Sequence, residues 1–183
     1  KDLSGLVYQE TSFSDHEDQY RIFSSRQKVD KETNLILSQT SNLNEINYLS
    51  YEEKVIALDP SNKIVEQVHD FVHTTFKDFF RSPITIVNSR ACISFNHSTS
   101  LPIAHKVPHC DGFEPGHLKV LLYPQGISEE TGLFFIEGID IGTHQPNAAV
   151  AFRNSELIHN TVPGTNKETV IVEITVLRTL INQ

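Results

Sequence analysis

The segment His109-Cys110-Asp111, together with the later His159, constrains the fold of this chain more than any other feature. In a β-strand, residues i and i+2 point to the same side, so His109 and Asp111 can both face one interior. For His159 to join them around one metal ion, it must arrive on another strand. The spacing therefore predicts a closed or sandwiched β-sheet in which the three side chains converge.

Two imidazoles and one carboxylate are also a chemically defined set of metal donors. Such a 2-His-1-carboxylate set holds adjacent faces of an ion, leaves other positions open, and suits non-haem Fe(II). A surface turn is the alternative for a bare His-x-Asp, because the chain contains nine histidines and the pattern can arise by chance. The order of the segments that follow the triplet separates these two interpretations.

Length and composition are those of a single globular domain. A chain of 183 residues can bury a full core, and 38% hydrophobic and 21% charged residues are ordinary values. We expect residues 1–183 to form one domain, with an N-terminal cover and helix over 1–82 and a β-sheet core over 83–178. No stretch is apolar and long enough to span a membrane, and no signal peptide is visible at Lys1.

Charge and cysteine content narrow the partners and the compartment. The net charge of −8 and the absence of a dense Lys/Arg run argue against nucleic acid as the main partner. Cys92 and Cys110 are the two cysteines, and Cys110 lies inside the metal triplet, where a disulfide would constrain the site. Reduced thiols in a cytoplasmic protein, without a membrane partner, are therefore expected.

One helix is predicted in the first half of the chain. Asp59 can cap its N-terminus with Pro60 at the first helical position, and Ser82-Pro83 ends it after Arg81. Residues 1–58 are polar and predict a cover of short strands and loops. We expect the helix to pack against the outside of a sheet through apolar residues at helical spacing: Ile64, Val65, Val68, Phe71, Val72, Phe76, Phe79 and Phe80.

After Pro83 the sequence changes to short runs rich in Val, Ile, Phe and Thr, separated by turn residues. No further helical period is present. Several short strands with regular turn signals indicate a sandwich or barrel. The predicted fold is mainly β with a flanking helix, a double-stranded β-helix or jelly roll with a cupin-like barrel. The predicted strands are 84–96, 117–124, 132–137, 147–153, 155–162 and 168–178.

In the order of its segments, the chain resembles the Fe(II)/2-oxoglutarate-dependent oxygenases over residues 84–178. The shared order is the His-x-Asp triplet, a long strand, a Gly turn, a strand, a strand end at Phe-Arg, the distal histidine and a last strand. Each motif is short, so the specificity comes from their order. The matching segments are PHCDG (108–112), HLKVLLYPQ (117–125), ETGLFFIEG (130–138), NAAVAFRNSELIHNTVPG (147–164) and KETVIVEITV (167–176).

The resemblance implies a mechanism. Fe(II) would be held by His109, Asp111 and His159, with 2-oxoglutarate and O2 at the remaining positions. A C–H bond of the substrate would be oxidised with release of succinate and CO2. The carboxylate of Asp111 favours hydroxylation over halogenation and leaves desaturation and ring formation open. The first choice of substrate is a small molecule, such as an amino acid or a biosynthetic intermediate. The second is a prolyl residue in a peptide.

The resemblance also implies an anchor for 2-oxoglutarate. The family usually carries a basic residue near the start of the last strand, with a Ser or Thr two residues later; here these are Lys167 and Thr169. Lys167 departs from the commonest pattern, being a lysine and slightly early, and an exposed turn is its alternative. Tyr123 can donate a hydrogen bond to the cosubstrate or be an ordinary core tyrosine. The other candidate anchors are Arg153, Arg178, Lys119 and Arg90.

Strand parity separates the two faces of the last strand. Val170, Val172, Ile174 and Val176 form a uniformly apolar face, whereas the opposite face carries Lys167, Thr169, Ile171, Glu173 and Thr175 and suits a polar interior. In 117–123, Lys119, Leu121 and Tyr123 share one face, opposite Leu118, Val120 and Leu122.

Three residues are candidate substrate contacts. Arg90 can meet a carboxylate, although a surface salt bridge is the commoner role, and His117 shares the parity of Tyr123. Glu173 on an interior face needs a partner. That partner is either a cation of this chain, among Lys119, Arg90 and Lys167, or a cationic group of the substrate.

Two other classes of protein share this architecture. A jelly-roll binding or scaffold domain without catalysis would leave the three predicted ligands scattered. A cupin-like metalloenzyme that does not use 2-oxoglutarate would generally begin its site with His-x-His, and His109-Cys110-Asp111 lacks that pattern. Metal content separates the first alternative from an oxygenase, and dependence on 2-oxoglutarate separates the second.

Overall fold

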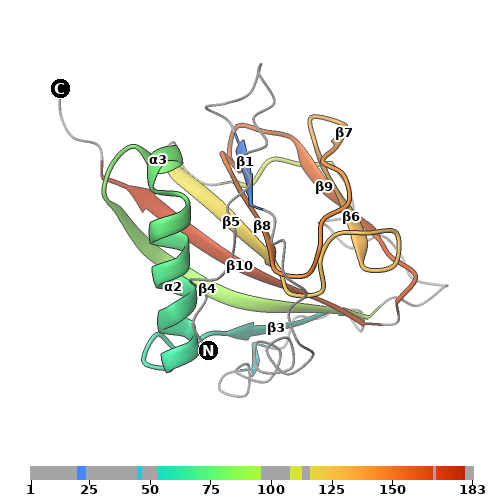
Figure 1. The fold of residues 1–183 in the computed structure, drawn as a ribbon, viewed down its shortest axis with the longest axis horizontal. Helices are drawn as coiled ribbons and strands as arrows, with labels where there is room; N and C mark the ends of the chain where they lie inside the picture. Colours follow the sequence, from blue (N-terminus) through green and yellow to red (C-terminus); the bar gives the residue numbers. More distant parts are fainter. Residues whose placement is uncertain are drawn as a thin grey trace.

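The computed structural model describes residues 20–23, 45–46, 53–95, 108–112, 116–166 and 168–179. Over these residues the chain forms two antiparallel sheets and one layer of helix (Figure 1). The elements are β1 (Tyr20–Phe23), β2 (Glu45–Ile46), β3 (Glu53–Ala57), α2 (Lys63–Thr75), α3 (Lys77–Phe80), β4 (Ile84–Phe95), β5 (His117–Tyr123), β6 (Gly132–Ile136), β7 (Ile139–Asp140), β8 (Ala148–Phe152), β9 (His159–Pro163) and β10 (Glu168–Arg178).

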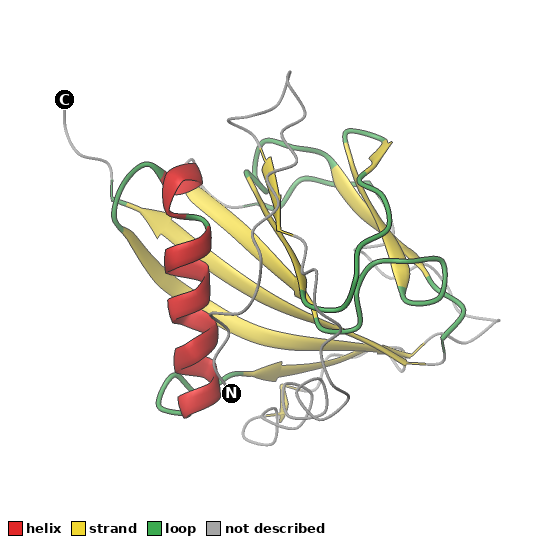
Figure 2. Ribbon diagram, viewed as in Figure 1, coloured by secondary structure: helices red, strands yellow, loops and turns green. Residues whose placement is uncertain are grey.

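The larger sheet has seven strands in the order β1-β8-β5-β10-β4-β3-β2, and the smaller has three in the order β7-β6-β9. Figure 2 shows the small sheet set apart from the long strands of the large sheet, on the side away from the helices. Leu121, Tyr123 and Phe152 of the large sheet form one buried cluster with Phe134 and Ile136 of the small sheet. The predicted mainly β jelly roll with a flanking helix is confirmed.

The helices cover the outer face of the large sheet, as predicted from their apolar stripe (Figure 1). Val65, Val68 and Val72 of α2 are buried against residues of β10 that include Val172 and Ile174. Burying a side chain of this size contributes roughly 1.5–3 kcal/mol. The helices therefore contribute to one of the two buried clusters of the core.

The boundaries of the helical region differ from the prediction. The N-cap is Asn62, whose side chain accepts a hydrogen bond from the Ile64 N–H at 2.9 Å, so Asp59 as N-cap was wrong. Asp59 instead accepts hydrogen bonds from the N–H and hydroxyl of Ser61, both at 2.8 Å, and closes a turn before the helix. The helical region is interrupted at Phe76 and ends at the left-handed Arg81, φ 57°.

Strand parity is confirmed in the two central strands. In β5, Leu118 and Val120 belong to the cluster under the helices, whereas Leu121 and Tyr123 belong to the cluster between the sheets. In β10, Val172, Ile174 and Val176 also lie under the helices. The opposite face of these two strands therefore lines the space between the sheets, where the predicted site lies.

Several strand boundaries were not predicted. The strand expected at 155–162 begins only at His159, because the N–H groups of Glu156 and Leu157 both donate to the Arg153 carbonyl and form a turn. The prediction of short strands within residues 1–58 agrees with β1 and β3. These strands are part of the large sheet, because β1 pairs with β8 and β3 pairs with β4. Cys92 is buried in β4, and Cys110 is exposed within the triplet.

In the part of the chain that the structure describes, no helix combines the length and the apolar character needed to cross a membrane.

Candidate metal centre

Backbone hydrogen bonds bring the His109–Asp111 segment to the start of β9. His109 and His159 exchange N–H to carbonyl bonds at 3.1 and 2.9 Å, which forms an isolated antiparallel bridge. The Asp111 N–H donates to the Asn154 carbonyl at 2.9 Å, in the turn that follows β8. The triplet is therefore fixed at both ends, and residues distant in sequence become neighbours.

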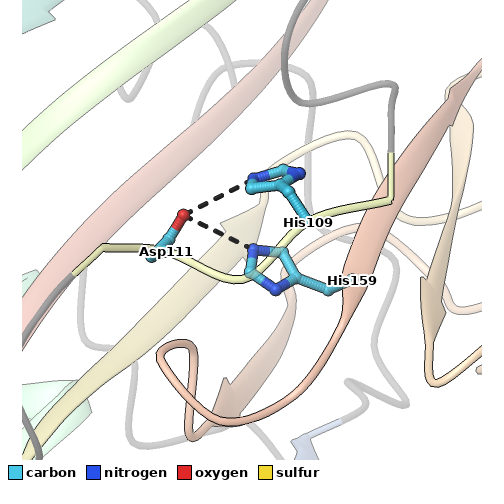
Figure 3. Close-up of side chains that lie close together, drawn as sticks. All are labelled: His109, Asp111 and His159. Carbon is cyan, nitrogen blue, oxygen red and sulfur yellow. Dashed lines mark ion pairs between the residues drawn. The ribbon is translucent and has the colours of Figure 1, made fainter.

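The three residues predicted to converge do lie together (Figure 3). Asp111 Oδ1 is 3.5 Å from His109 Nε2 and 3.7 Å from His159 Nε2. One ligand atom from each residue lies within 4.8 Å of the other two. Two imidazole nitrogens and one carboxylate oxygen facing one point form a donor set suited to a transition metal with open positions.

His159 is held in the form that can bind a metal. Its Nδ1 lies 2.9 Å from the Leu157 carbonyl, which can only accept, so we assign the proton to Nδ1 and leave Nε2 free of one. Burial lowers the pKa of His159, and this effect outweighs the Leu157 carbonyl and Asp111, which raise it. Phe152 packs edge-on against the imidazole, with ring centroids 4.8 Å apart. The ring is therefore neutral and fixed.

Asp111 is held through its second oxygen. Oδ2 contacts the Lys119 ammonium and accepts a hydrogen bond from Asn154 Nδ2 at 2.9 Å. Burial alone would raise the pKa of Asp111, but Lys119, Asn154 and His159 together lower it below its ordinary value. The carboxylate is therefore ionised at neutral pH, as a metal ligand must be.

The charges of Glu173 and Arg90 are paired on the inner face of the sheet. Arg90 Nε donates a hydrogen bond to Glu173 Oε2 at 2.7 Å, and a terminal nitrogen of the same guanidinium forms an ion pair with that oxygen at 2.6 Å. Lys119 Nζ lies 3.8 Å from the same oxygen. The sequence left open whether Glu173 pairs with a cation of this chain or with a cationic group of the substrate. In the structure it pairs with Arg90 and lies near Lys119, both cations of this chain.

Tyr123 and Thr169 are both buried on the inner face. The Tyr123 hydroxyl has no hydrogen-bond partner among the described residues, and burial, followed by the nearby Glu173, raises its pKa well above the ordinary value. It is therefore a protonated donor, able to satisfy a carboxylate oxygen. Thr169 lies opposite Ser94 near the start of β10 and is 7% exposed.

Of the remaining predicted residues, Arg153, Arg178 and His117 lie elsewhere in the described part of the chain. Arg153 pairs with Glu156 at 3.3 Å. Burial, and to a smaller extent the charge of Arg153, lowers the pKa of Arg178. His117 begins β5 opposite Leu177. Lys167, the predicted cosubstrate anchor, lies outside the described residues.

Sequence reasoning missed the two residues that orient Asp111. Asn154 is fully buried, and its side chain donates to Asp111 from the turn between β8 and β9. A turn has no residue periodicity from which such a contact could be predicted. Lys119 was noted as a candidate anchor and as a partner of Glu173. The position of Lys119 on the same face of β5 as Tyr123 predicts that its side chain points between the sheets, which is consistent with its contact with Asp111.

Comparisons with known proteins add evidence for the fold. No protein-family model matches the sequence, and no curated protein matches it significantly. Solved structures do match. SnoN, a non-haem α-ketoglutarate-dependent epimerase from nogalamycin biosynthesis, aligns with a TM-score of 0.68 at 10% identity. The alignment covers 88% of this chain and 77% of SnoN.

Two further structures resemble the chain to a similar extent. HygX from Streptomyces hygroscopicus, solved with nickel and 2-oxoglutarate, gives a TM-score of 0.63 at 11% identity over 90% of this chain and 84% of HygX. The collagen prolyl hydroxylase of Paramecium bursaria Chlorella virus-1, a 2-oxoglutarate complex, gives 0.60 at 9% identity over 88% of this chain and 96% of the viral enzyme. The family resemblance read from the sequence is therefore supported by structure, and the chain has the fold of the Fe(II)/2-oxoglutarate-dependent oxygenases.

Proposed function

We propose that the protein is an Fe(II)- and 2-oxoglutarate-dependent oxygenase that oxidises a C–H bond of a small molecule. The observation that carries this proposal is the convergence of ligand atoms of His109, Asp111 and His159 within 4.8 Å of one another in a jelly roll. A binding domain without catalysis has no need to bring these three side chains together. The fold shared with SnoN and HygX supports the same conclusion.

The described residues fit the cofactor and the cosubstrate. His109, Asp111 and His159 would hold Fe(II), which supplies the activation of O2 together with 2-oxoglutarate. The Leu157 carbonyl keeps Nε2 of His159 available to the ion. The buried, unpartnered hydroxyl of Tyr123 would donate a hydrogen bond to a carboxylate oxygen of 2-oxoglutarate. Thr169 and Lys167 are proposed to assist at the far carboxylate, as the family pattern implies.

Substrate size is inferred from charge and from the similar structures. The net charge of −8 disfavours a nucleic-acid substrate. SnoN has been solved with nogalamycin RO, and HygX with hygromycin B, both of them small molecules. Arg90, with its side chain one-third exposed at 33%, is the proposed contact for an anionic group of the substrate, and His117 is a second candidate.

A prolyl residue in a peptide is the second candidate substrate. It is favoured by the viral collagen prolyl hydroxylase, 96% of whose chain is covered by the alignment. Turnover of proline-containing peptides, compared with turnover of a small-molecule library under the same conditions, decides between the two.

The decisive experiment is an anaerobic titration of the Fe(II)-loaded protein with 2-oxoglutarate, monitored by the weak visible charge-transfer band of the chelate. We expect a band that saturates with 2-oxoglutarate and is absent in His159→Ala. Bound metal without a band would favour the cupin-like alternative. A folded protein that binds no metal would favour a binding domain.

A further inference from the structure

Four charged side chains form a line that runs from Asp111 onto the inner face of the large sheet. Asp111 contacts Lys119 of β5, Lys119 lies 3.8 Å from Glu173 of β10, and Glu173 pairs with Arg90 of β4. The strands β5, β10 and β4 are neighbours, and Glu173 lies directly opposite Arg90 in the register. Of these four residues, only Asp111 belongs to the metal donor set.

The two carboxylate oxygens of Asp111 face different partners. Oδ1 is 3.5 Å from His109 Nε2 and 3.7 Å from His159 Nε2, so it faces the point where a metal would be held. Oδ2 contacts Lys119 and accepts from Asn154 Nδ2 at 2.9 Å. The carboxylate is therefore oriented so that a single oxygen faces the imidazoles.

We propose that Lys119 is a positioning residue that keeps Asp111 a one-oxygen ligand of the metal. This inference rests on the metal site of the proposed function. A carboxylate can bind a metal through one oxygen or through both. Because the Lys119 ammonium and the metal are both cations, Lys119 competes for Oδ2 and prevents it from closing a further coordination position. That position then stays open for 2-oxoglutarate or O2.

Glu173 and Arg90 explain how the Lys119 ammonium can be accommodated next to a metal cation. A buried ammonium is repelled by a nearby dication, and its own burial is costly without a carboxylate. Lys119 is only 6% exposed. Glu173 supplies a second carboxylate, and the hydrogen bond and ion pair with Arg90 hold Glu173 Oε2 in place. The two anions and two cations of the line cancel.

The test uses Mn(II) as the probe, without cosubstrate, in the full chain. Water-proton relaxation and EPR report the affinity for Mn(II) and the number of waters bound to the ion. We expect Lys119→Met to bind Mn(II) at least as tightly as the wild type and to lose about one coordinated water, because both oxygens of Asp111 then bind the ion. Lys119→Arg should retain the wild-type number of waters, and Lys77→Met, on the exposed side of α3, is the matched control.

Because removing one partner of a buried ion pair can unfold a domain, a second variant is needed. Lys119→Met combined with Glu173→Gln removes one charge of each sign, and the same loss of about one water is expected. An unchanged number of waters in a folded Lys119→Met protein would overturn the inference, as would loss of Mn(II) binding in that folded protein. A folded wild-type protein that does not bind Mn(II) would instead overturn the proposed function.

Discussion

Asn154 and Asp111 are joined by two hydrogen bonds that run in opposite directions. The Asp111 N–H donates to the Asn154 carbonyl at 2.9 Å, and the Asn154 amide donates to Asp111 Oδ2 at 2.9 Å. The pair fixes both the backbone and the carboxylate of the predicted metal ligand. Asn154 itself is fully buried.

The first prediction concerns Asn154→Ala. Groups that orient a metal ligand typically contribute 10–100-fold to metal affinity, so we expect the dissociation constant for Fe(II) or Mn(II) to rise by about that factor. We also expect the free energy of unfolding to fall by about 1–3 kcal/mol, because a hydrogen bond from a fully buried side chain to a carboxylate is lost. Metal titration and chemical denaturation measure the two effects. Asn88→Ala, at an exposed position of β4, is the control and should change neither value.

The second prediction tests the triad itself. His109→Ala should abolish tight metal binding while changing the free energy of unfolding little, because the His109 side chain is 32% exposed. Asp111→Ala should also abolish metal binding, but with a larger loss of stability, since it leaves the buried Lys119 with Glu173 at 3.8 Å as its remaining carboxylate. His73→Ala, on the exposed face of α2, should bind metal normally. Normal metal content in either triad variant would contradict the assignment.

The third prediction is that Tyr123→Phe separates cosubstrate binding from metal binding. The hydroxyl has no partner among the described residues, and an unsatisfied buried hydroxyl costs roughly 1–3 kcal/mol. The variant should therefore be as stable as the wild type or about 1 kcal/mol more stable. The dissociation constant for 2-oxoglutarate should rise by about tenfold, corresponding to one lost hydrogen bond, while the affinity for the metal stays the same. An unchanged dissociation constant for 2-oxoglutarate would exclude Tyr123 from the cosubstrate site.

The sequence predicts those parts of the fold that depend on residue periodicity. The apolar face of Val172, Ile174 and Val176 packs under the helices, and Tyr123 lies between the sheets, because alternate residues of a strand point to opposite sides. The predicted convergence of His109, Asp111 and His159 is found, but the triplet does not lie on a strand. His109 forms an isolated bridge with His159, and Asp111 is held by the Asn154 carbonyl, so local hydrogen bonds rather than strand alternation bring the three side chains together.

Local hydrogen-bond competition limits the rest of the prediction. The Asp59 carboxylate accepts a hydrogen bond from the Ser61 N–H, whereas the Asn62 side chain accepts one from the first turn of the helix. Both residue types are common N-caps, so the sequence alone does not distinguish them. Asn154 reaches Asp111 through a turn without periodicity, so its role depends on tertiary structure. The sequence offers several cations as partners for Glu173. The register of β10 with β4, which the sequence does not show, places Arg90 directly opposite Glu173.

The fourth prediction concerns the pH dependence of stability at the interface between helix and sheet. His69 of α2 is hydrogen-bonded to Ser89 of β4, with 2.7 Å between Nε2 and Oγ. Burial, and then the neighbouring His73, lowers the pKa of His69 below 6.5, against the smaller opposing effect of Asp70. The folded state therefore binds the proton less readily than the unfolded state. The contribution of His69 to stability is complete above about pH 6.5 and is lost as the pH falls through its folded-state pKa.

Chemical denaturation of the metal-free protein between pH 5 and 8 measures this effect, with His69→Gln as the test variant. The free energy of unfolding of the wild type should fall as the pH decreases below about 6.5. The variant should show a shallower fall, with a remainder due to His159, whose pKa is also lowered, chiefly by burial. His73→Gln, at an exposed position of the same helix, is the matched control and should leave most of the slope in place. Equal slopes in the wild type and His69→Gln would show that protonation of His69 does not oppose folding.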